Sequence, residues 1–115
     1  MTVTIYHNPR CSKSRQTLAL LEEKGINPTI VTYLDTPPSA TELAAILKKL
    51  GANPRDIMRK NEQPYKDLGL GKADLSDADL INAMVAHPIL IERPIVVSGA
   101  KAALGRPPEQ VLDIL

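Results

Sequence analysis

The sequence holds one cysteine, Cys11, at a place where a thiol could act as a nucleophile. It follows a short predicted strand and stands at the start of a predicted helix, inside the run from His7 to Arg15. Backbone N–H groups at a helix start are unpaired and carry partial positive charge, which stabilises a thiolate. With cations such as Arg10, Lys13 and Arg15 nearby in sequence, the pKa of a cysteine falls from ~8.5 into the range ~3.5–7.5. We therefore predict that Cys11 is reactive and substantially ionised at neutral pH.

Ser14 stands three residues after Cys11, where a dithiol oxidoreductase would carry its second cysteine. Because the sequence has no other cysteine, any sulfur-based turnover must take its second thiol from outside, from glutathione or from a partner protein. The Ser14 hydroxyl has two open roles, a hydrogen bond to the thiolate or a hydrogen bond to nearby backbone. His7 also has open roles: it could contact the loop or modulate the thiol, or it could be only the polar end of a strand.

Two other kinds of site are not expected. One cysteine and two distant histidines, His7 and His87, lack the ligand spacing of a zinc site, so no metal is predicted. A phosphatase loop of the form Cys-x5-Arg is also excluded, because Thr17 occupies the position of its arginine.

Composition narrows the function classes further. A chain of 115 residues is long enough for one domain with its own core. Its net charge of +1 creates no field typical of proteins that bind nucleic acid or membranes, and three tyrosines without Phe or Trp offer no platform for stacking bases. A lone cysteine and the lack of a long apolar segment fit the reducing cytosol. We expect a cytoplasmic monomer without direct contact to nucleic acid or membrane.

The elements that must position Cys11 form a β-α-β unit. Residues 3–6 alternate as a short strand does, and residues 12–24 have helical periodicity that ends at Gly25. Residues 29–34 read as a second strand, which a helical crossover would make parallel to the first.

The rest of the chain is predicted to be helical in the middle and to return to strands. Capping boxes at Ser39 and Ser76 begin two helices, and Pro54 sits in the first turn of a short helix between them. Residues 65–71 read as turn and loop. The chain is then predicted to form a buried strand at 95–97, a weaker strand at 101–104 and a last helix that opens at 107–109.

Several separated blocks together resemble the glutaredoxin-coupled arsenate reductase family, whose sister group is the Spx-type regulators. The blocks are His7-Asn8-Pro9-Arg10-Cys11 with Ser14-Arg15, Arg59-Lys60-Asn61, His87-Pro88-Ile89-Leu90-Ile91, Arg93-Pro94-Ile95-Val96-Val97 and Gly105-Arg106-Pro107. The resemblance implies an α/β, thioredoxin-like (glutaredoxin-like) fold with a mixed sheet and helices on both faces. It implies one domain over residues 1–115, with a helical insertion at about 37–88 between the second and third strands.

The resemblance also implies roles for individual residues. Cys11 would be the nucleophile. The arsenate oxyanion and its arsenic-bound intermediates would be held by Arg59, Arg93 and Arg106, each of which, taken singly, reads as a solvated surface residue. Guanidinium groups suit this task because they stay charged and bind oxyanions with two parallel hydrogen bonds. Supporting roles are implied for His7, Ser14 and Pro94, the last as a cis-proline beside the active site.

The implied reaction is reduction of arsenate to arsenite without a bound cofactor. Glutathione would be the co-substrate, and glutaredoxin would reduce the mixed disulfide left on Cys11. Two alternatives of the same fold stay open: a regulator of the Spx type that binds RNA polymerase, and a glutathione-dependent thiol transferase. Ser14 removes the Cys-x-x-Cys switch that such regulators often use.

Overall fold

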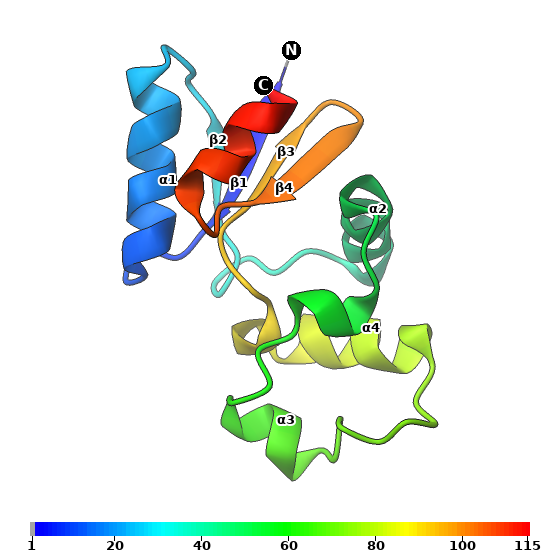
Figure 1. Ribbon diagram of the computed structural model, residues 1–115. Coiled ribbons are helices and arrows are strands. Elements are labelled where there is room, and N and C mark those ends of the chain that lie inside the picture. Colours follow the sequence, from blue (N-terminus) through cyan, green and yellow to red (C-terminus); the bar gives the residue numbers. More distant parts are fainter. Residues whose placement is uncertain (1) are drawn as a thin grey trace. The chain divides into compact units, whose positions relative to one another are not determined.

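The computed structural model describes residues 2–115, which divide into two compact units (Figure 1). The first unit joins residues 2–36 to Arg93–Leu115, the two ends of the described part of the chain. The second unit, Pro37–Glu92, lies in the sequence where a helical insertion at about residues 37–88 is predicted. No helix within residues 2–115 has the length and apolar character needed to cross a membrane.

The first unit is built on a mixed sheet of four strands. In spatial order these are β2 (Thr29–Thr32), β1 (Val3–His7), β3 (Ile95–Ser98) and β4 (Lys101–Leu104). Only β1 and β2 run parallel, and helix α1 (Ser12–Glu23) makes the crossover that a parallel pair requires. The predicted β-α-β unit is therefore confirmed, as is the mixed α/β fold class.

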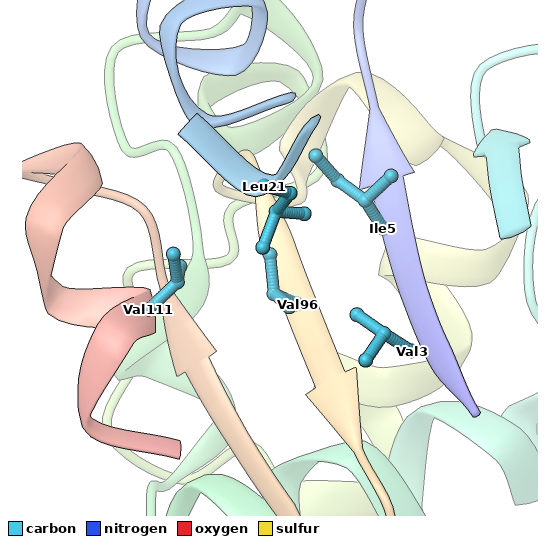
Figure 2. Close-up of a cluster of buried hydrophobic side chains, with 5 residues drawn as sticks. All are labelled: Val3, Ile5, Leu21, Val96 and Val111. Atoms are coloured by element: carbon cyan, nitrogen blue, oxygen red, sulfur yellow. The ribbon is translucent and has the colours of Figure 1, made fainter. Parts of the chain in front are cut away.

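Alternate residues of β1 and one residue of β3 point into one apolar core (Figure 2). Val3 and Ile5 of β1 and Val96 of β3 meet Leu21 of α1 and Val111 of the last helix there, and all five side chains are buried. This last element, η3 (Pro108–Ile114), is a 3₁₀-helix. Burial of apolar area stabilises the unit, so the core holds α1 against the sheet with its first turn following the end of β1.

The second unit is helical. It contains α2 (Ala40–Leu50), the 3₁₀-helix η1 (Pro54–Ile57), α3 (Gln63–Asp67), α4 (Asp77–Ala86) and the 3₁₀-helix η2 (Pro88–Leu90). Both predicted capping boxes are confirmed, because the Ser39 and Ser76 side chains each accept the backbone N–H of the third helical residue at 3.1 Å. Gly51 ends α2 in the left-handed conformation, with φ of 64°.

Three element predictions were wrong in part. Residues 65–71 are not all loop, because α3 covers Gln63–Asp67 and uses Pro64 in its first turn. The second strand ends at Thr32 instead of residue 34, since the Thr32 carbonyl accepts the N–H groups of Asp35 and Thr36 and turns the chain. The last element is a 3₁₀-helix instead of an α-helix.

Candidate active site around Cys11

Cys11 is the N-cap residue of α1, in extended conformation with φ of −93° and ψ of 123°. Its N–H donates to the Asn8 carbonyl at 3.0 Å, and its own carbonyl accepts the Arg15 N–H at 3.0 Å. These two bonds fix the turn between β1 and α1. The thiol is partly buried and stands at the helix start, as predicted.

The surroundings of Cys11 lower the pKa of its thiol below the ordinary value. Partial burial alone would raise that pKa, but the backbone N–H of Ser14, the Arg93 guanidinium and the backbone N–H of Lys13 outweigh burial by stabilising the thiolate. Arg93 acts both as a hydrogen-bond donor and through its charge. The direction of the predicted shift is confirmed, and substantial ionisation at neutral pH stays a prediction.

The source of the positive charge differs from the prediction. The cation that stabilises the Cys11 thiolate is Arg93, not the sequence neighbours Arg10, Lys13 and Arg15, and Lys13 contributes through its backbone. Arg15 instead donates from Nη1 to the Pro9 carbonyl at 2.9 Å. Side chains that follow each other in a first helical turn point in different directions, so closeness in sequence did not place these charges on the sulfur.

Ser14 and His7 form a buried pair beneath the loop. The Ser14 Oγ atom lies 2.6 Å from His7 Nδ1 and accepts the Asn8 N–H at 3.0 Å, and the Ser14 side chain has no solvent exposure. Burial, aided by the charge of Arg15, lowers the pKa of His7. A neutral imidazole can accept the Ser14 hydroxyl proton at Nδ1. Of its two open roles, the Ser14 hydroxyl therefore takes the local one, while its backbone N–H serves the thiolate.

Arg93 and Pro94 belong to the segment that leads into β3, and the bond between them is cis, as predicted. The Pro94 carbonyl accepts the Gly105 N–H at 2.9 Å, and Arg106 Nη1 donates to the Arg93 carbonyl at 3.3 Å. The structure thus brings Arg93 to Cys11 and Arg106 to the backbone of Arg93. A second cis bond, between Arg106 and Pro107, was not anticipated.

Gly105 is a residue whose structural role the sequence patterns missed. A Cβ atom at this position would collide with the Thr17 Oγ1 atom and lie 2.7 Å from Pro94 Cγ. Thr17 is itself fully buried in α1 and donates from Oγ1 to the Lys13 carbonyl at 2.8 Å. Gly105 therefore allows the end of β4 to touch both α1 and the cis-proline. The available signal was a glycine directly before Arg106 and two prolines.

Arg59 lies in the second unit and is surrounded by carboxylates. Its Nη1 atom donates to Glu92 Oε1 at 2.9 Å, and its Nε atom lies 3.5 Å from Glu62 Oε1. The Arg59 backbone N–H donates to the Leu90 carbonyl at 2.7 Å. These contacts fix the side chain within its own unit, and its predicted contact with an oxyanion stays a prediction.

Comparison with known proteins supports a single family. A model described as the ArsC family matches residues 6–114. An arsenate reductase of Haemophilus influenzae is 57% identical over the whole of both chains, and an uncharacterised Escherichia coli protein, YfgD, is 57% identical over 98% of this chain and 96% of its own. A solved structure described as an arsenate reductase from Vibrio cholerae is 58% identical and superimposes with a TM-score of 0.97, covering 100% of this chain and 98% of the other.

Proposed function

The chain belongs to the ArsC family, and we propose that it reduces arsenate to arsenite with Cys11 as the nucleophile. The observation that carries this proposal is the thiol of Cys11 at the start of α1, with its pKa lowered and the Arg93 guanidinium bonded to it. A thiolate next to a guanidinium and to helix N–H groups can receive an oxyanion and attack its central atom. The relatives named as arsenate reductases support arsenate as that oxyanion.

Arsenate binding would use the groups beside the sulfur. Arg93 already reaches Cys11, and Arg106 contacts the Arg93 backbone, so two guanidinium groups stand in the same part of the first unit. Two-pronged hydrogen bonds from guanidinium to the arsenate oxygens would compensate the negative charge and orient arsenic toward the sulfur. Family resemblance adds Arg59 as a third ligand of the oxyanion.

The first chemical step makes a bond between sulfur and arsenic. The Cys11 thiolate attacks arsenic(V), and one arsenate oxygen takes up protons and leaves as water. Arsenic stays in the +5 state in this step. A low thiol pKa helps because the thiolate, and not the thiol, is the nucleophile.

The second step transfers the electrons. A glutathione thiolate attacks the Cys11 sulfur, a sulfur–sulfur bond forms, and the sulfur–arsenic bond breaks with its electron pair left on arsenic. Arsenic is thereby reduced to the +3 state and leaves as arsenite. A thiolate of glutaredoxin then attacks the glutathione sulfur and releases Cys11. External thiols are required because Cys11 is the only cysteine in the chain.

The test is arsenate turnover with glutathione, glutaredoxin, glutathione reductase and NADPH, followed as NADPH oxidation. The wild-type protein should turn over arsenate, and Cys11→Ser should lose all measurable activity because an unactivated hydroxyl replaces the thiolate. Ser12→Ala, at the neighbouring exposed position, should remain active. Activity retained by Cys11→Ser would refute the proposal. A wild-type protein that reduces a glutathione mixed disulfide but not arsenate would instead be a thiol transferase.

A further inference from the structure

A pocket of about 280 Å³ lies in the first unit beside the loop that carries Cys11, and the reaction steps above do not use it. One wall is the end of β1 with the loop after it, residues 7–10, and the other is Thr32, the last residue of β2, with Leu34 and Asp35 after it. His7 and Thr32 are paired at the last position of these parallel strands. Ligands commonly bind beyond the carboxyl ends of parallel strands.

The walls of this pocket carry one positive and one negative side chain. Arg10 and Asp35 are both exposed, and within residues 2–115 no ion pair joins them to each other. The Leu34 side chain is 43% exposed and adds an apolar surface. The pocket therefore offers a cation, an anion and an apolar contact to a ligand that carries both charges.

Hydrogen bonds hold both charged residues in fixed turns. The Arg10 N–H donates to Asn8 Oδ1 at 3.0 Å, and the Asp35 N–H donates to the Thr32 carbonyl at 3.0 Å. The same Asn8 accepts the N–H of Cys11 through its carbonyl, so one short turn links the pocket wall to the nucleophile. A ligand seated between Arg10 and Asp35 can extend along this turn toward the sulfur.

We propose that this pocket binds the γ-glutamyl end of glutathione, with Arg10 on its α-carboxylate and Asp35 on its α-ammonium group. The proposal rests on the proposed function and names the site of its thiol co-substrate. Pockets for whole drug-sized ligands measure ~300–1,000 Å³, so this smaller volume suits one amino-acid-sized end of the tripeptide. Arsenate is a poor alternative occupant, because it has no positive charge for Asp35 and that carboxylate repels it.

The test measures glutathione binding without arsenate. In the Cys11→Ser protein, which cannot form a mixed disulfide at this position, glutathione is titrated by calorimetry or by NMR shifts. Adding Asp35→Asn should weaken the Kd about tenfold, the loss expected for one contact between charged groups. Adding Asp113→Asn, the same change at an exposed position of η3, should leave the Kd unchanged.

A second probe identifies which end of glutathione occupies the pocket. Glutaryl-cysteinyl-glycine lacks the α-amino group but keeps the carboxylate, so it should bind more weakly than glutathione and lose nothing further with Asp35→Asn. Equal effects of Asp35→Asn on both probes, no effect on either, or no measurable binding of glutathione would overturn the assignment.

A protein that shows the expected pattern but reduces no arsenate would support the pocket and refute the proposed reaction. A protein that reduces arsenate with an unchanged Kd in Asp35→Asn would refute the pocket alone.

Discussion

Arg93 and Arg59 have the same proposed role but opposite surroundings. The Arg93 guanidinium donates to the Cys11 sulfur, where it stabilises negative charge that chemistry can use. The Arg59 guanidinium meets two carboxylates, Glu92 at 2.9 Å and Glu62 at 3.5 Å, which already compensate its charge. An oxyanion gains more from a cation whose charge is not shared with fixed carboxylates. Identical side chains that match one family pattern can therefore contribute unequally.

The largest expected effect in this contrast comes from Arg93→Ala. Hydrogen bonds to charged groups are worth about 1.5–3 kcal/mol, so kcat/KM for arsenate should fall about 10- to 100-fold. Arg59→Ala should cost less. The pKa of Cys11 should rise in Arg93→Ala, because the guanidinium favours the thiolate, and the acid limb of the pH profile of kcat/KM should move to higher pH.

Thiolate absorbance measured during a pH titration checks the pKa, and steady-state kinetics check the rate. Arg93→Lys is the control, since it keeps a positive charge but loses the planar donor group. In Arg93→Lys, the pKa of Cys11 and the kcat/KM for arsenate should lie between the values of the wild type and those of Arg93→Ala. Equal losses of kcat/KM in Arg59→Ala and Arg93→Ala would show that the two arginines contribute equally and contradict this prediction.

A middle-sized effect is expected at Gly105, where the segment after Arg93 depends on close packing instead of charge. The added methyl group of Gly105→Ala would collide with Thr17 and crowd Pro94. Overpacking of this kind costs about 1–3 kcal/mol of the free energy of unfolding, measurable by urea denaturation. Gly71→Ala is the control, because the nearest atom to its Cβ, in Tyr65, is 3.8 Å away. Similar stability of the two variants would show that the close approach at Gly105 can relax.

The smallest expected effect tests the carboxylates around Arg59. Glu92→Gln removes a negative charge, so Arg59 should attract arsenate more strongly. The pair with Glu92 is partly buried, but it lies near the protein surface. Surface ion pairs are worth about 0.2–1 kcal/mol, and the KM for arsenate should accordingly fall no more than about fivefold. In an Arg59→Ala background the same change should have no effect on KM. A fall in KM that persists without Arg59 would show that Glu92 acts on the oxyanion by another route.

Local features of this fold were predictable because local bonds create them. The capping boxes at Ser39 and Ser76 follow from residues within one helical turn. The position of Cys11 at the start of α1 follows likewise from a predicted strand and the helical pattern after it. Such signals need no knowledge of distant residues.

Contacts between distant segments were not predictable from the same patterns. Closeness in sequence suggested that Arg10, Lys13 and Arg15 surround the thiol. In the folded protein, the cation beside the thiol is Arg93, from the segment before β3. The pocket near Asp35 was missed for a related reason. Its wall exists only because β2 ends at Thr32 and the chain turns there, two residues before the predicted end.

Ser14 gives the loop around Cys11 one lasting property. Its side chain is fully buried and hydrogen-bonded to His7 and to the Asn8 backbone. Unlike a thiol, its hydroxyl group does not exchange with disulfides. In two-cysteine loops, by contrast, oxidation joins both positions covalently and reduction separates them. Here the backbone that frames Cys11 is anchored by an inert group, so this anchor stays in place whether the sulfur is bare, bound to arsenic or joined to a second thiol.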